Sequence, residues 1–301
     1  MSNRVSLSPR DLSLLRLLSW TPATSALLKR ASIAFDGEPF LDERRVRERL
    51  QALGSEGFVR SWPAAHGRGG LQNYYKITPS GFHRLHGTEA TQPTRAFFAE
   101  VSPSLFDHTF RVAEVIVEVV RASHLKRVQV VRFIRENELT LTTASGAVQP
   151  DGFFRLLSGG RRFNVAFEID NSTESLDSLV ANSLRTKVSI YDEYQDTVLR
   201  RWLDGGKAWE RPRLRVVFLT RSVARAYHIL SLTSSLTRNA ARRLVYAATH
   251  EAFVTDAEPL HSPLFVDHRG SWQSLVELHP TSRHRKTSVF LPQFDRIPTF
   301  E

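Results

Sequence analysis

Three acidic residues flank a short turn in the middle of the chain. Asp151 follows a proline at the start of one apolar segment, and Glu168 and Asp170 end the next one, after a turn at Gly159 and Gly160. Because side chains alternate between the faces of a strand, Glu168 and Asp170 point to the same side, and pairing of the segments brings Asp151 near Glu168. Carboxylate oxygens suit Mg²⁺ or Mn²⁺, so we expect these three acids as metal ligands. Such an ion activates water for attack on a phosphate.

The elements that must position these acids follow one another in a regular order. Apolar periodicity and turn residues predict helices over 107–123, 172–196 and 223–236, and strands over 128–134, 148–158, 161–170, 214–220 and 242–248. The glycine pair favours a tight hairpin between the second and third strands. This order over residues 107–248 resembles the restriction-endonuclease-like, or PD-(D/E)XK, fold, which implies an α/β nuclease-like domain.

The resemblance raises the question of the catalytic lysine. In the family pattern a lysine that aids the attacking water stands two residues after the glutamate, whereas this chain has Asp170 there. Lys187 lies on a largely apolar face of the following helix, and a buried lysine needs an acidic partner. Some families of this superfamily carry their lysine on this helix, so we expect Asp151, Glu168 and Lys187 to form the catalytic set. The alternatives are that Lys187 extends to solvent, and that Asp170 pairs with an arginine or caps the helix.

The first part of the chain has a different order. Ser8 and Pro9 begin a helix, a second helix follows, and a third contains Val46, Leu50 and Leu53 on one face. Two strands with a glycine-rich tip come next. Three short helices and a hairpin are typical of a winged helix-turn-helix domain. We expect double-stranded DNA to be bound by four arginines on the outward face of the third helix and by the hairpin tip, namely Arg44, Arg45, Arg47, Arg49, His66 and Arg68. The alternatives are a solvated basic face and a protein-docking surface.

Composition narrows the class of protein. The 301 residues carry a net charge of +10 with a pI near 10.3, which favours a polyanionic partner such as nucleic acid. The chain has no cysteine, so disulfides and thiolate zinc sites are excluded. No apolar run approaches the ~18–20 residues of a membrane span, and the first residues lack a signal-peptide core. We expect a bacterial cytoplasmic protein with no membrane partner.

We therefore predict an α+β winged helix-turn-helix domain followed by an α/β restriction-endonuclease-like domain. The boundaries are 1–86 for the DNA-binding domain, 87–106 for a linker, 107–255 for the nuclease-like domain, and 256–301 for a C-terminal extension with a basic tail. The second domain is expected to add DNA contacts or to form a homodimer.

The chain as a whole resembles the replication-relaxation family of bacterial plasmids and mobile elements. The resemblance is carried by Leu7–Leu18, Tyr74–Leu85, the helix that contains His108, Pro150–Leu156, Phe167–Ser175, Lys187 with Tyr191, and Leu244–Phe253. It implies a winged helix fused to an endonuclease-like domain, in a protein tied to plasmid replication or mobilisation. It does not decide the biochemical activity.

Three functions are compatible with these patterns. The first is a DNA-binding protein of a mobile element that controls replication, mobilisation or transcription. The second is a DNA endonuclease that uses Mg²⁺ or Mn²⁺ and a lysine supplied by the helix after the hairpin. The third is a catalytically inactive adaptor that docks a protein partner. We favour the first, because it requires only the charge and the fold.

Overall fold

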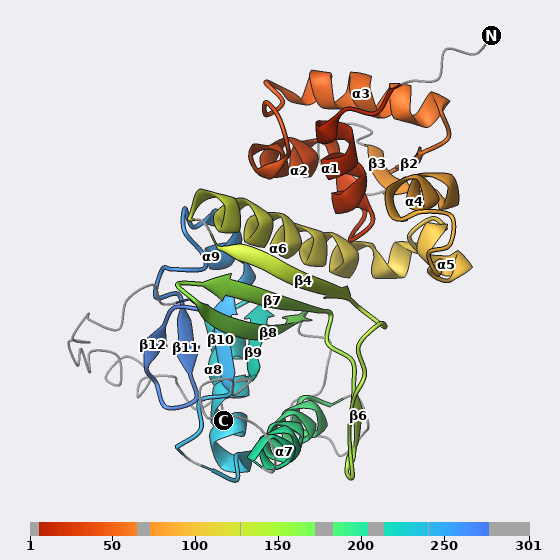
Figure 1. Ribbon diagram of the computed structural model, residues 1–301. Helices are drawn as coiled ribbons and strands as arrows, with labels where there is room; N and C mark the ends of the chain where they lie inside the picture. Colours follow the sequence, from red (N-terminus) through yellow and green to blue (C-terminus); the bar gives the residue numbers. More distant parts are fainter. Residues whose placement is uncertain are drawn as a thin grey trace. The chain divides into compact units, whose positions relative to one another are not determined.

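The structure, a computed structural model, describes residues 6–64, 73–126, 128–171, 183–203, 214–239 and 241–276 (Figure 1). The chain divides into two compact units, residues 1–128 and 129–301. The helix at 106–125 therefore belongs to the first unit, whereas the sequence analysis grouped it with the residues that follow it. No helix among the described residues combines the length and the apolar character needed to cross a membrane.

The first unit contains helices and a small antiparallel sheet. Its strands lie in the order β1-β3-β2. Its elements are α1 (Pro9–Leu18), β1 (Ala23–Thr24), α2 (Ser25–Ala31), η1 (Ser32–Ala34), α3 (Glu43–Ser55), β2 (Val59–Pro63), β3 (Asn73–Ile77), α4 (Pro79–His86), α5 (Arg95–Phe98), η2 (Pro103–Leu105) and α6 (Phe106–Leu125). The three helices and the β2–β3 hairpin thus occur in the predicted order.

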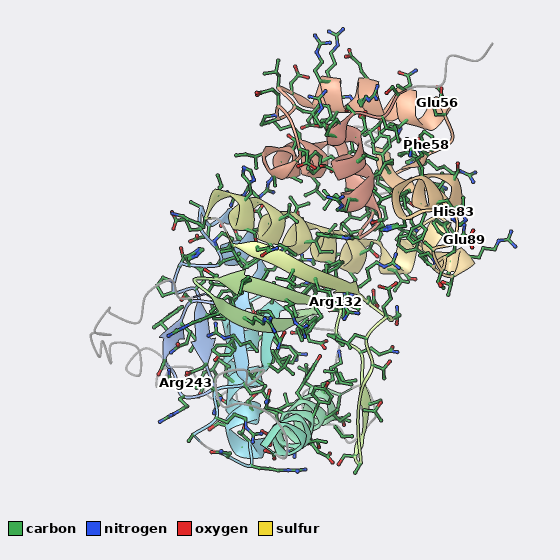
Figure 2. The ribbon with its side chains drawn as sticks, in the orientation of Figure 1. Glu56, Phe58, His83, Glu89, Arg132 and Arg243 are labelled. Atoms are coloured by element: carbon green, nitrogen blue, oxygen red, sulfur yellow. The ribbon has the colours of Figure 1, made fainter. Side chains whose placement is uncertain are left out.

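Local sequence signals explain how α1 and α3 form. Ser8 caps α1 and exchanges hydrogen bonds with Asp11 in a capping box, and Pro9 occupies the first turn, as predicted. Val46, Leu50 and Leu53 are buried on the inner face of α3. Helix α4 packs closely on the segment before β2, which contains Phe58 (Figure 2). The contact requires glycine at position 81, since an added Cβ would lie 2.2 Å from the carbonyl oxygen of Phe58.

The segment after α4 packs on the small sheet. Val101 N–H donates to the Tyr74 hydroxyl at 2.8 Å, and the amine of Lys76 donates to the carbonyl of Ala99. Burial lowers the pKa of Lys76 to about 8. Helix α6 contains a buried acid, Glu118. Its side chain is fully buried because it forms ion pairs with arginines of α2 and α6.

The second unit is built on a mixed seven-stranded sheet with the order β12-β11-β10-β9-β8-β7-β4. Strands β8, β9 and β10 are parallel, and the other neighbours are antiparallel. The strands are β4 (Gln129–Arg135), β7 (Gly152–Ser158), β8 (Arg161–Asp170), β9 (Leu214–Thr220), β10 (Val245–Thr249), β11 (Phe265–Asp267) and β12 (Trp272–Gln273). The predicted mixed α and β class is therefore correct for this unit.

Three helices and a small hairpin accompany the sheet in the described part of this unit. They are α7 (Leu184–Leu203), α8 (Val223–Leu236), α9 (His250–Thr255) and the pair β5 (Leu141–Thr143) and β6 (Gly146–Val148). The sequence pattern predicted α8 with its observed bounds but did not predict β5 and β6. Residues 172–182, the expected start of the helix after β8, lie outside the described part of the chain, as does the basic tail over 277–301.

The sheet positions the acids through its turn and its core. Gly159 and Gly160, with φ of 53° and 73°, form the expected two-residue turn between β7 and β8. One face of β8 and β9 packs against α7 and α8, with Ala166 and Phe218 in the same buried cluster as Val188. Residues of β8 on this face therefore point towards the helices, and Glu168 and Asp170 are among them.

Candidate functional site

Asp151 is held next to Glu168 by the pairing of β7 with β8. Gly152 lies opposite Phe167, so the residue before Gly152 comes level with the residue after Phe167. The carboxylate of Asp151 accepts a hydrogen bond from the backbone N–H of Ile169 at 2.5 Å. This bond fixes Asp151 beside the end of β8, as the hairpin pattern predicted.

Glu168 is the centre of the site. Its side chain is buried at the end of β8, with 3% exposed. Lys187 of α7 donates to its Oε2 at 2.9 Å, and the hydroxyl of Tyr191, one turn further along, donates to its Oε1 at 2.5 Å. The structure thus contains the contact expected between Lys187 and Glu168. Tyr191 was recognised in the sequence beside Lys187 but was not assigned to the site.

Burial dominates the electrostatics of Glu168. Removal from water raises the pKa of Glu168 to about 7, and the charge of nearby Asp151 acts in the same direction. The attraction of Lys187 and the hydrogen bond from Tyr191 act against this rise without cancelling it. At neutral pH Glu168 is therefore close to the midpoint of its titration, and a cation that needs its carboxylate competes with a proton.

Asp170 has a different partner. Arg225, in the first turn of α8, donates to both oxygens of Asp170, from Nε at 2.6 Å and from a terminal nitrogen at 3.1 Å. The structure contains the arginine pair that the sequence left open as one alternative for Asp170, and the helix start that the other alternative requires lies outside the described residues. Asp151 and Glu168 are therefore better placed than Asp170 to act as metal ligands.

Glu136 is an additional acid that the sequence analysis missed. It follows β4, and one of its carboxylate oxygens lies within 4.8 Å of one from Asp151. Its sequence context, a polar loop, carries no signal of a site, because the proximity depends on the pairing of β4 with β7. The carboxylates of Asp151 and Glu168 suit Mg²⁺ or Mn²⁺, and each carboxylate oxygen has two lone pairs, so Glu168 can contact an ion while it accepts from Lys187.

The arginines of α3 fall into two groups. The side chains of Arg44, Arg45 and Arg47 are 80%, 64% and 54% exposed and pair with glutamates of the same helix at 2.9–3.5 Å. The expectation that Arg49 also faces outward was wrong. Its guanidinium forms a forked ion pair with the fully buried side chain of Asp11, in the first turn of α1. The predicted tip residues His66 and Arg68 lie outside the described residues.

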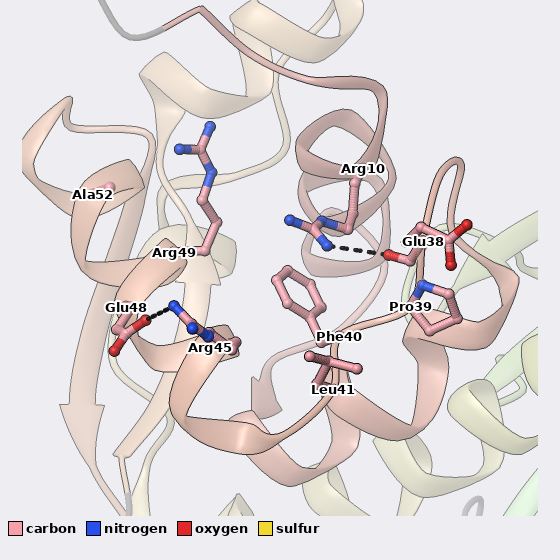
Figure 3. A pocket seen from close by; sticks show the side chains of 9 residues that line it. All are labelled: Arg10, Glu38, Pro39, Phe40, Leu41, Arg45, Glu48, Arg49 and Ala52. Carbon is pink, nitrogen blue, oxygen red and sulfur yellow. Dashed lines mark hydrogen bonds and ion pairs between the residues drawn. The ribbon is translucent and has the colours of Figure 1, made fainter.

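Two hollows flank α3 in the first unit. One of about 710 Å³ lies between α3 and the start of α1, where Arg10, Arg45 and Arg49 surround the ring of Phe40 (Figure 3). The guanidinium of Arg10 lies 4.2 Å from the centre of that ring. The other hollow, of about 590 Å³, lies between α3 and the β2–β3 hairpin and is lined by Arg47, Arg60, Tyr75 and polar neighbours. The exposed ridge of α3 between them is therefore accessible.

Comparisons with known proteins identify one matching family and one similar structure. The family model described as replication-relaxation matches residues 15–203, which is more than half of the chain. No curated protein matches the chain. Among solved structures, the restriction endonuclease FokI is similar with a TM-score of 0.28 and 9% identity. That match covers 83% of this chain and 44% of FokI, so the chain spans less than half the length of that protein.

Proposed function

Because the chain belongs to the replication-relaxation family, we propose that it is a double-stranded DNA-binding protein of a plasmid or mobile element. It acts in the control of replication, mobilisation or transcription, in the bacterial cytoplasm. The observation that carries this proposal is the ridge of three exposed arginines on α3, next to the β2–β3 hairpin. The net charge of +10 supports a polyanionic partner.

The proposed interface uses the first unit as a winged helix. Helix α3 is the recognition helix, which enters the major groove, and the β2–β3 hairpin is the wing, which contacts the backbone. Arg44, Arg45 and Arg47 supply positive charge along the ridge, and the hollow beside the wing adds Arg60. Arginine contacts with phosphates set the affinity and make it depend on salt.

Removal of the ridge arginines tests this interface. The triple variant Arg44→Ala/Arg45→Ala/Arg47→Ala is expected to bind a DNA duplex more weakly. The plot of log affinity against log salt should become shallower by about three, at roughly one for each lost phosphate contact. Fluorescence anisotropy with a labelled duplex at several salt concentrations measures both quantities.

A matched control removes the same charge from elsewhere. Arg84, Arg95 and Arg161 are exposed residues outside α3, and their replacement by alanine leaves the ridge intact. The control variant is expected to keep most of the salt dependence. Equal losses in both triple variants would mean that α3 has no special part in binding, and a flat salt plot for the wild type would reject DNA binding.

The second candidate function is a metal-dependent DNA endonuclease. The observation that favours it is the convergence of Asp151, Lys187 and Tyr191 on the buried Glu168. Asp151 and Glu168, with Glu136 nearby, would hold Mg²⁺ or Mn²⁺. The ion would supply activation of water and stabilisation of phosphate charge. Lys187 would orient the water and the phosphate from the side of α7, and Tyr191 would hold the Glu168 carboxylate in place.

Binding of Mn²⁺ by this site should depend on pH. The ion needs ionised Glu168, whose pKa burial raises to about 7, so affinity for Mn²⁺ should increase about tenfold from pH 6 to pH 8. Calorimetric titration with Mn²⁺ at several pH values measures this change. In Glu168→Gln the affinity should be low and nearly independent of pH. Absence of Mn²⁺ binding at every pH would reject the metal site and leave the adaptor hypothesis for the second unit.

A further inference from the structure

Strand β8 carries two acid–base pairs in succession. Glu168 pairs with Lys187 of α7, and Asp170 pairs with Arg225 of α8. Residues two apart in a strand share a face and are about 6.6 Å apart, so the two pairs lie side by side along β8. Both acids are buried, and the two basic side chains are only 18% and 12% exposed.

Stability alone does not account for the second pair. Replacing a buried ion pair by well-packed apolar side chains is often neutral or stabilising, because desolvation offsets the attraction. Arg225 also lies in the first turn of α8, where the helix dipole disfavours a cation, and that turn contains no acidic residue. The placement of a cation here is better explained by an anionic ligand that Arg225 binds in addition to Asp170.

The position of the pair points to a ligand at the end of the sheet. Asp170 and Thr220 are paired at the last positions of the parallel strands β8 and β9, and in sheets of this kind ligands bind outside the carboxyl ends of the strands. The fork with Asp170 sets the plane of the guanidinium of Arg225. A guanidinium of fixed orientation suits phosphate oxygens.

We propose that Arg225 binds a phosphate of the DNA strand that occupies the Asp151–Glu168 site, and that Asp170 is the positioning residue for Arg225. This inference rests on the second candidate function and adds its phosphate-binding residue. The family pattern has one lysine at position 170. In this chain two cationic side chains would take its place, with Lys187 beside Glu168 and Arg225 beside the phosphate. Asp170 acts through Arg225.

The test removes the pair without leaving a buried charge. In Asp170→Asn/Arg225→Gln the charged pair becomes an amide pair of similar size. Binding of the full chain to a short duplex is measured in Ca²⁺ over a range of salt concentrations. We expect the slope of log affinity against log salt to become shallower by about one, because one phosphate contact is lost.

The chain offers a control at another buried pair of the same unit. Asp192 and Arg242, with 2% and 12% exposure, lie outside the proposed site, and Arg242 also pairs with Asp196, which is 25% exposed. Asp192→Asn/Arg242→Gln is expected to keep the wild-type slope. Equal slopes for the two double variants would overturn the proposal, since a purely structural pair would not change the number of phosphate contacts.

Two further measurements separate the possible failures. If the amide pair lowers the melting temperature, the apolar pair Asp170→Leu/Arg225→Met is measured in its place, with the same expected slope. Cleavage of supercoiled DNA by the wild type in Mn²⁺ is assayed in parallel. An inactive wild type rejects the nuclease function, whereas an unchanged slope in the Asp170/Arg225 variants rejects the role of Arg225.

Discussion

Replacement of Lys187 by methionine is expected to lower Mn²⁺-dependent DNA cleavage by at least about a hundredfold. A side chain that positions or transfers a proton in the transition state typically contributes 10² to 10⁴ in rate. Lys187 is the cation that contacts Glu168 directly, at 2.9 Å, and methionine has a similar length without charge. Nicking of supercoiled DNA, followed on gels under conditions in which wild type is active, measures the loss.

The same variant is expected to remain folded. Without Lys187, Glu168 loses an attraction that opposes the rise in its pKa, so it takes up a proton more readily and leaves no buried charge. The hydrogen bond from Tyr191 remains available to it. Circular dichroism and thermal unfolding check the fold. Lys29→Met, which removes an exposed charge from α2, is the control and should cleave like wild type. Full activity of Lys187→Met would exclude this lysine from the reaction.

Breaking the pair between Arg49 and Asp11 should have the largest effect on stability. In Arg49→Ala the free energy of unfolding is expected to fall by about 3–5 kcal/mol, because a fully buried carboxylate loses its ionic partner. Burial by itself raises the pKa of Asp11, but hydrogen bonds from Arg49 and Ser8 outweigh it, so the pKa of Asp11 lies below 3.8. Urea unfolding of the full chain near neutral pH measures the change.

Two comparisons make this result specific. Arg44→Ala removes an exposed arginine of the same helix and should cost less than about 1 kcal/mol. Because the folded-state pKa of Asp11 is depressed, its stabilising contribution is present above the unfolded value of 3.8 and is lost as pH falls through the folded value. The difference between wild type and Arg49→Ala should therefore shrink in strong acid. A difference that stays constant would mean that the charge pair is not its source.

Features encoded within a few residues could be predicted from the sequence. Ser8 with Asp11 gives the capping box of α1, and the two glycines give the turn that joins β7 to β8. Lys187 could also be predicted, because helical spacing placed it on the face of α7 that turns towards the sheet. Each of these depends on one element, or on two elements joined by a tight turn.

Features that depend on distant segments could not be predicted. Asp11 and Arg49 meet across two helices, and Asp170 meets Arg225 only after β9 has been placed beside β8. The proximity of Glu136 to Asp151 requires the register of β4 against β7. In these cases the residue types are visible in the sequence, but their partners are set by packing. The family resemblance supplied the order of the elements and left these pairings open.

The two pairs along β8 also fix the charge balance of the site. With all acids ionised, Glu168 cancels Lys187 and Asp170 cancels Arg225, so Asp151 and nearby Glu136 leave two formal negative charges. A divalent cation held by the proposed site would neutralise this excess. The loaded site would then carry no net charge, and the attraction between the chain and DNA phosphates would come from basic side chains outside it.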